Sequence, residues 1–142
     1  IAPTVDPNLR ITIPIEPIAE VVVTDTEIHF NPILFEFNKY EITKQSKKIL
    51  DKLVYIMNQN VAMEIYIKAH TDSKGTAKYN LNLSEKRVQS TVNYILSKGI
   101  STTRISGKGF GETEPRINCG DKCTDEEHFQ NRRSEFLIVK DK

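Results

Sequence analysis

The sequence lacks any apolar run long enough to cross a bilayer as a helix, which takes about 20 residues. Its longest apolar cluster, Ile18–Val23, is short and is interrupted by Glu20. A secretory signal is also absent, because no basic start is followed by an apolar core. The chain opens at Ile1, and we interpret it as part of a longer or processed protein. The missing signal therefore indicates nothing about the compartment.

A surplus of charge of either sign is lacking as well. The formal net charge is +1 over 142 residues, whereas domains that bind nucleic acid by bulk electrostatics are clearly basic. We therefore expect no nucleic-acid partner. Hydrophobic residues make up 38% of the chain and charged residues 27%, a composition typical of one globular domain with a core.

Cysteine is scarce, with two residues, Cys119 and Cys123, in one loop-like stretch. Their even number and short spacing favour a local disulfide, which indicates an oxidising compartment. Two free thiols are the simpler alternative. A zinc site completed by His128 is a third, although it lacks paired spacing and a fourth ligand. We expect no metal and no cofactor.

Prolines concentrate in residues 1–27, which contain four of the six in the chain. Proline fixes φ and removes a backbone donor, so this segment should be extended. We predict a linker here. Ile11, Ile13 and Ile15 alternate with other residues, which would suit an added edge strand. Residues 28–142 are then predicted to form the folded domain.

The rest of the chain alternates between strand and helix patterns. Strands are predicted at 33–37, 61–70, 104–107 and 134–140, helices at 43–59 after Thr43 and at 84–98 after Ser84, and a short helix from the capping-box spacing of Thr124 and Glu127. This order predicts an α/β fold. We expect a two-layer βαβαβ(α)β sandwich in which the helices cover one face of a four-stranded mixed sheet.

The glycine-rich segment Gly107–Gly111 has a superficial likeness to a dinucleotide-binding loop. Its third glycine is wrongly spaced, and the residues after it do not open a helix where a pyrophosphate would bind. We predict a tight turn at a strand end instead.

A hydrolase triad from His70, Asp72 and Ser73 is also unconvincing. Near neighbours at a strand end cannot easily converge into a nucleophile, a base and an orienting group, and no nucleophile elbow is present. We therefore expect no catalysis from these residues.

Asp72 and Arg87 form a more informative pair. Asp72 follows a predicted strand, and Arg87 falls in the first turn of the helix predicted after Ser84, so both could border one cleft. A carboxylate suits an ammonium, and a guanidinium binds a carboxylate through two hydrogen bonds. Together they would bind the zwitterionic end of an amino acid. A plain Asp72–Arg87 salt bridge is the simpler alternative.

Two adjacent arginines, Arg132 and Arg133, precede the last predicted strand. Such a pair is weak evidence for any ligand. It is typical of a solvated basic turn, or of arginines that tie a loop to nearby carboxylates.

Five segments, in order, resemble the OmpA-like C-terminal domain family. They are Phe35–Ile42, His70–Gly75, Tyr79–Arg87, Gly107–Pro115 and Asn131–Glu135. The second is similar to the family's His-Thr-Asp signature, and the third to its Asn-x-x-Leu-Ser-x-x-Arg segment. This resemblance implies exposure in the periplasm, near the outer membrane of a Gram-negative cell. It also implies non-covalent binding of the diaminopimelate-containing stem peptide of peptidoglycan, without turnover.

The resemblance also implies roles for individual residues. Asp72 would bind the side-chain ammonium of diaminopimelate and Arg87 its terminal carboxylate, helped by backbone amides at the helix start near Ser84. The other expected pocket residues are Asn38, Asn80, Thr71, Leu83 and Asn131. Many relatives have Asp in place of Asn38, so this chain lacks one negative charge there.

The cysteine-bearing insertion is not general to the family. It resembles relatives from Bacteroidetes-type bacteria, some of which carry this domain at the end of multi-domain lipoproteins, including type IX secretion components. We expect a cell-wall anchor that does not itself insert into the membrane. A protein-interaction module with envelope partners is one alternative, and an enzyme acting on cell-wall amides is the other.

Overall fold

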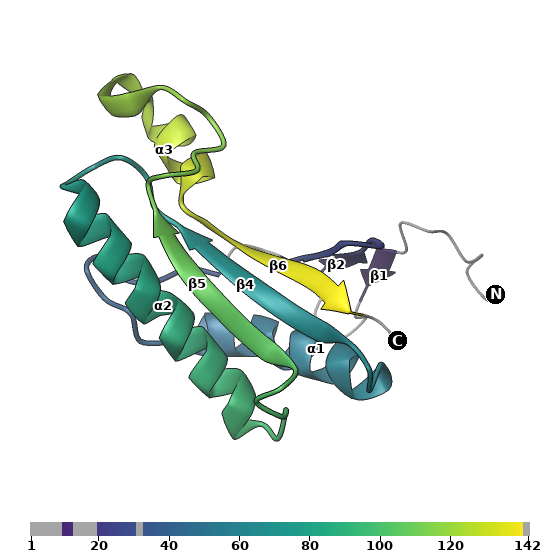
Figure 1. Ribbon diagram of the computed structural model, residues 1–142. Coiled ribbons are helices and arrows are strands. Elements are labelled where there is room, and N and C mark those ends of the chain that lie inside the picture. Colours follow the sequence, from purple (N-terminus) through teal and green to yellow (C-terminus); the bar gives the residue numbers. More distant parts are fainter. Residues whose placement is uncertain (1–9, 13–19, 31–32, 141–142) are drawn as a thin grey trace.

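One mixed sheet of six strands organises the fold. The computed structural model describes residues 10–12, 20–30 and 33–140, and within them the strand order is β1-β2-β3-β6-β4-β5 (Figure 1). The strands are β1 Arg10–Thr12, β2 Glu20–Val23, β3 Glu27–His29, β4 Glu64–His70, β5 Ile105–Gly111 and β6 Arg133–Lys140. β4 and β5 run parallel, and the other neighbours pair antiparallel.

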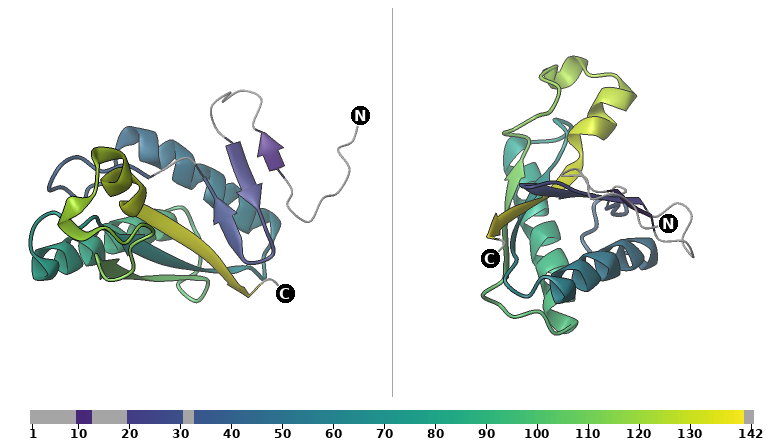
Figure 2. Two further views of the ribbon diagram at one scale, coloured as in Figure 1. Left: turned by 90° about the horizontal axis from the view of Figure 1, so that it is seen from above. Right: turned by 90° about the vertical axis from the view of Figure 1, so that its right-hand side faces the viewer.

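Two long helices lie on one side of β4, β5 and β6, and a short third helix lies at one end (Figure 2). They are α1 Lys44–Gln59, α2 Ala77–Ser97 and α3 Asp125–Asn131. Thr43 caps α1, and Thr124 with Glu127 forms a complete capping box on α3, so both predicted helix starts are confirmed. The α/β sandwich is likewise confirmed, and the described residues give its sheet six strands in place of the four predicted. Among the described helices, none is long and apolar enough to cross a membrane.

The core lies between the sheet and the two long helices. Its fully buried members are Val21, Ile28, Leu50, Leu53, Met57, Ile65, Ile67 and Ile95. Two strands, β1 and β2, come from the proline-bearing segment 1–27. Ile11 falls in β1, whereas Ile13 and Ile15 lie outside the described residues.

The prediction of a strand at 33–37 is wrong, because this segment runs as a loop beside α1. The hydroxyl of Ser46 accepts the Leu34 N–H at 3.2 Å and donates to the Leu34 carbonyl at 3.0 Å. A side chain therefore satisfies backbone groups that a strand would pair. Ile33 and Phe35 still pack against the core, which explains the apolar alternation. The edge of β6 that faces away from β4 is paired by β3 instead.

Helix α2 begins about two turns earlier than predicted. Thr76, not Ser84, is its N-cap, and the Thr76 hydroxyl accepts the Tyr79 N–H at 3.1 Å. Ser84 is buried inside the helix, where its hydroxyl donates to the Leu81 carbonyl and accepts the Gly111 N–H, both at 2.9 Å. The amides near Ser84 are therefore internal to α2, so the prediction that they help to hold a carboxylate is wrong.

The glycines of segment 107–111 let α2 pack directly on the sheet. They belong to β5, which extends to Gly111, so the predicted tight turn is wrong. A Cβ added at Gly109 would lie 2.5 Å from the carbonyl carbon of Ser84, and one at Gly107 would lie 2.7 Å from Cγ1 of Val88, both residues of α2. Both separations are far below van der Waals contact, so the close approach of α2 to β5 requires glycine.

Candidate ligand-binding site

A cleft of about 350 Å³ opens at the carboxyl end of β4. Its walls come from the loop 33–38, the first half of α2 and the residues that join α3 to β6. Six of the seven predicted ligand residues line it, namely Asn38, Thr71, Asp72, Asn80, Leu83 and Arg87. The fold thus brings together residues from three separate segments of the sequence.

The carboxylate of Asp72 is held in one orientation by two contacts. Its Oδ1 accepts the Lys74 N–H at 3.0 Å, and its Oδ2 lies 2.6 Å from Nη1 of Arg132. Asp72 is only 8% exposed. Because a carboxylate has about four acceptor positions, it can still accept a hydrogen bond from a ligand ammonium.

Arg87 lies in the middle of α2 and reaches across to the loop 33–40. Its Nε donates to the Lys39 carbonyl at 3.0 Å and its Nη2 to the Glu36 carbonyl at 3.4 Å. The guanidinium carbon lies 4.8 Å from the centre of the Phe35 ring, a cation–π arrangement. Burial lowers the pKa of Arg87 from its ordinary value. A partly desolvated guanidinium of this kind binds a ligand carboxylate more strongly than one in water.

The simple salt bridge between Asp72 and Arg87 is not formed. Asp72 has its ion pair with Arg132, and Arg87 donates to backbone carbonyls. Since the two charges do not neutralise each other directly, both can act on a ligand.

The polar residues behind Asp72 fix the backbone of its loop. The amide of Asn80 donates to the carbonyls of Asp72 and Lys74 and to the Glu112 carboxylate, at 3.3, 2.8 and 2.8 Å. The hydroxyl of Thr71 donates to the Asp72 carbonyl at 2.8 Å. Asn80 and Thr71 thus support the binding loop.

Asn38 and Leu83 form parts of the cleft wall. Asn38 adopts a positive φ of 60°, a conformation that asparagine tolerates better than most residues. Its side-chain oxygen accepts the hydroxyl of Tyr79, so the loop is tied to α2. Leu83 is partly buried on the same helix.

Asn131 lies outside the lining of the cleft. It is buried, and its amide pairs with both backbone groups of Ile117, at 2.8 Å to the N–H and 3.0 Å to the carbonyl. Through these two contacts Asn131 holds the two ends of the segment 117–131 together.

Arg132 is the site residue that the sequence reasoning missed. It lines the cleft and forms the ion pair with Asp72. Arg133 pairs with Glu135 at 2.9 Å. Both arginines therefore tie this turn to nearby carboxylates, as the second of the two sequence interpretations predicted. The sequence feature that could have indicated Arg132 is its position directly before the last predicted strand, because that strand pairs with β4 in the fold.

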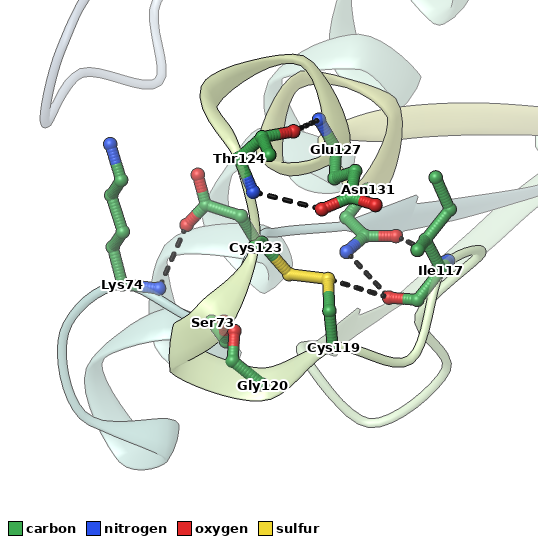
Figure 3. The surroundings of a disulfide bond; sticks show 10 residues. Ser73, Lys74, Ile117, Cys119, Gly120, Cys123, Thr124, Glu127 and Asn131 are labelled. Atoms are coloured by element: carbon green, nitrogen blue, oxygen red, sulfur yellow. Dashed lines mark hydrogen bonds between the residues drawn. A yellow bond between two sulfur atoms is a disulfide. The ribbon is translucent and has the colours of Figure 1, made fainter.

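A disulfide between Cys119 and Cys123 closes the loop next to the Asp72 turn (Figure 3). The hydroxyl of Ser73 donates to the carbonyl of Gly120 within that loop. The closed loop therefore contacts the turn that carries Asp72.

The disulfide removes both alternatives for the cysteines. Neither Cys119 nor Cys123 is a free thiol. The zinc site with His128 loses its two sulfur ligands, because sulfur binds zinc as a thiolate.

The three residues considered for a hydrolase triad point to different partners. His70 Nε2 lies 3.2 Å from Glu135, Ser73 donates to Gly120, and Asp72 contacts Arg132. They therefore do not form the relay that such catalysis requires.

His70 should make stability sensitive to acid. Burial, together with the charge of Arg133, lowers the pKa of His70 below its ordinary value of 6.5, against the opposing effect of Glu135. As the pH falls below about 6.5, the unfolded chain takes up a proton that the folded protein resists, so stability falls. We expect the melting temperature of His70→Gln to decrease less than that of the wild type between about pH 7.5 and pH 5.5.

Replacement of an exposed histidine provides the control for this experiment. The side chain of His29 is 51% exposed and lies 3.7 Å from Glu27, so His29→Gln shows how much of any change comes from the loss of an imidazole that is not buried. Identical pH profiles for His70→Gln and the wild type would show that His70 does not contribute.

Comparisons with known proteins agree with this architecture. The sequence profile of the OmpA family matches residues 34–132. The peptidoglycan-associated lipoprotein of Haemophilus influenzae is 29% identical over 112 residues, which cover 79% of this chain and 71% of that protein. Outer membrane protein A of Klebsiella aerogenes is 37% identical over 97 residues, which cover 66% of this chain and 27% of that protein.

Solved structures resemble the fold closely. A MotB-like protein of Desulfovibrio vulgaris superposes with a TM-score of 0.73 at 25% identity, covering 89% of this chain and 83% of that one. The cell wall anchor of the type VI secretion system of Pseudomonas aeruginosa gives 0.70 at 18% identity, covering 85% and 87%, a likeness of fold alone. Because the family profile spans more than half of its residues, the chain belongs to the OmpA family.

Proposed function

We propose that the cleft binds the diaminopimelate-containing stem peptide of peptidoglycan without turnover, and that this binding anchors an outer-membrane or periplasmic assembly to the cell wall. The observation that carries the proposal is the placement of Asp72 and Arg87 in one cleft without a bond between them. The side chain of diaminopimelate ends in an ammonium and a carboxylate on one carbon. Asp72 binds the ammonium and Arg87 the carboxylate.

The relatives support this proposal by what they are named. One is a peptidoglycan-associated lipoprotein, and one structural neighbour is a cell wall anchor. We accordingly place the domain in the periplasm, associated with the outer membrane. We further propose that residues 28–142 form the binding domain and that residues 1–27 act as its linker. The strands β1 and β2 of that segment join the sheet.

The disulfide loop supports a narrower proposal. The loop closed by Cys119 and Cys123 resembles that of Bacteroidetes-type lipoproteins, and we propose a role of this kind, as in the type IX secretion component PorE. The alternative is a protein-interaction module of an envelope complex, in which the same loop contacts a protein partner.

Calorimetric titration tests the proposal directly. We expect saturable heat with a stem tripeptide that ends in meso-diaminopimelate, and binding at least about tenfold weaker with the lysine tripeptide, since lysine lacks the carboxylate that Arg87 binds. A single site should bind modestly, and anchoring would come from many tethered copies on one polymer.

The opposite results are equally informative. If a folded sample binds neither peptide, the interaction-module alternative takes first place. Release of a cleavage product during long incubation with muropeptides would show that the domain is an enzyme and not an anchor.

A further inference from the structure

The cleft contains more basic than acidic side chains. Asp72 is the one acidic residue in its lining, among the residues that the structure describes. The basic residues of the lining, apart from His70, are Lys74, Arg87, Arg132 and Arg133. The excess of positive charge indicates that the ligand brings more negative than positive charge.

Two of these basic residues have acidic partners outside the lining. Arg133 Nε lies 2.9 Å from Glu135, and Lys74 Nζ lies 4.0 Å from Asp125. Neither partner lines the cleft. The charge that faces a ligand therefore comes from the carboxylate of Asp72 and from the two guanidinium groups of Arg87 and Arg132.

Arg132 pairs with Asp72, and the charge of Asp72 also acts on Arg87. Together these three groups carry a net charge of one positive. The side chain of Arg132 is 43% exposed, and one nitrogen, Nη1, contacts Asp72 at 2.6 Å. No other hydrogen bond of its guanidinium is seen within the described part of the chain. A guanidinium has five N–H donors, so Arg132 has donors left for a second acceptor.

We propose that Arg132 binds a second carboxylate of the ligand, so that the cleft selects stem peptides in which diaminopimelate is the last residue. This inference rests on the proposed function. Diaminopimelate in that position has one free ammonium and two free carboxylates, a net charge of one negative. It therefore complements Asp72, Arg87 and Arg132 group by group.

A following D-alanine changes this match. It converts the main-chain carboxylate of diaminopimelate into a peptide bond and moves the negative charge one residue further along the chain. An amide cannot replace a carboxylate opposite a guanidinium without loss of the charge-assisted hydrogen bond.

Three synthetic peptides test the inference by calorimetry. They are the diaminopimelate tripeptide with a free carboxyl end, the same tripeptide with its main-chain carboxyl amidated, and the tetrapeptide that ends in D-alanine. We expect the free tripeptide to bind wild-type protein roughly tenfold more tightly than either of the others. Arg132→Gln should reduce this preference to less than about twofold.

Arg116→Gln is the matched control, because Arg116 is exposed and lies outside the lining of the cleft. It removes the same charge and should leave the preference unchanged. Arg132→Lys keeps a cation at the position and should keep part of the preference, which guards against a folding defect in Arg132→Gln.

Each contrary outcome has its own meaning. Equal binding of all three peptides to the wild type overturns the role of Arg132 and leaves the proposed function intact. Tight binding of the tetrapeptide, with weak binding of the amidated tripeptide, overturns selection for a terminal diaminopimelate. If none of the peptides binds to folded protein, the inference and the proposed function fail together.

Discussion

Arg87→Ala is expected to weaken binding of the diaminopimelate tripeptide about 100-fold or more, the effect of truncating one partner of a desolvated charge pair. The variant leaves the ligand carboxylate without its guanidinium in a cleft that already excludes part of the solvent. Titration calorimetry measures the loss. Asp72→Asn should have a comparable effect, because it removes the charge that faces the ammonium and keeps the shape of the side chain.

The stability of Arg87→Ala should fall as well, by about 1–2 kcal/mol. Arg87 donates two hydrogen bonds to the loop 33–40, to the carbonyls of Lys39 and Glu36. Arg104→Ala is the matched control. Arg104 also donates to backbone carbonyls, including that of Met63 at 2.9 Å, but it lies at the opposite end of β4. It should lower the melting temperature and leave binding unchanged. Wild-type affinity in a folded Arg87→Ala protein would refute the proposed site.

Gly109→Ala is expected to destabilise the fold by about 3 kcal/mol, the upper part of the range for overpacked cores. The added methyl group would lie 2.5 Å from the Ser84 carbonyl carbon. The obstacle is helix backbone and not the flexible end of a side chain. Helix α2 must therefore move away from β5, and contacts along the whole helix weaken. Urea denaturation followed by circular dichroism measures the change.

Ser106→Ala is the control for Gly109→Ala, since Ser106 is an exposed residue of the same strand. It should change the free energy of unfolding by less than about 0.5 kcal/mol. A Gly109→Ala protein as stable as the wild type would mean that α2 can shift without loss, and the packing argument would be wrong.

Local signals predicted the helix starts best. Thr43, Thr124 and Glu127 act within one turn of their own helices, so sequence spacing was sufficient to place them. Ser84 was misplaced because its hydroxyl, although suited to an N-cap, bonds to Gly111 of β5. A contact between residues 27 positions apart has no signal in a local pattern.

The strand predicted at 33–37 failed for a related reason. Its alternation of apolar residues is real, and Ile33 and Phe35 do pack on the core. However, a strand needs a partner for its backbone, and Ser46 takes that place at Leu34. Sequence periodicity records burial, and it does not record which group satisfies the backbone.

The cleft was predicted as a set of residues but not as a set of contacts. The family resemblance pointed to Asp72 and Arg87. It did not reveal that Arg132 pairs with Asp72, because that contact joins residues 60 positions apart. The antiparallel pairing of β4 with β6, which sets His70 opposite Arg133, brings these two segments together.

The short pairing of β3 has a mechanical consequence for an anchor. β3 joins β6 at two residue pairs, Glu27 with Leu137 and Ile28 with Phe136, whereas β4 joins β6 at seven. Tension between a ligand held in the cleft and the chain ahead of β2 would load the β3–β6 junction before it loads the β4–β6 pairing. Under such tension β1, β2 and β3 should therefore separate from β6 first, while the cleft keeps its shape and stays bound to the cell wall.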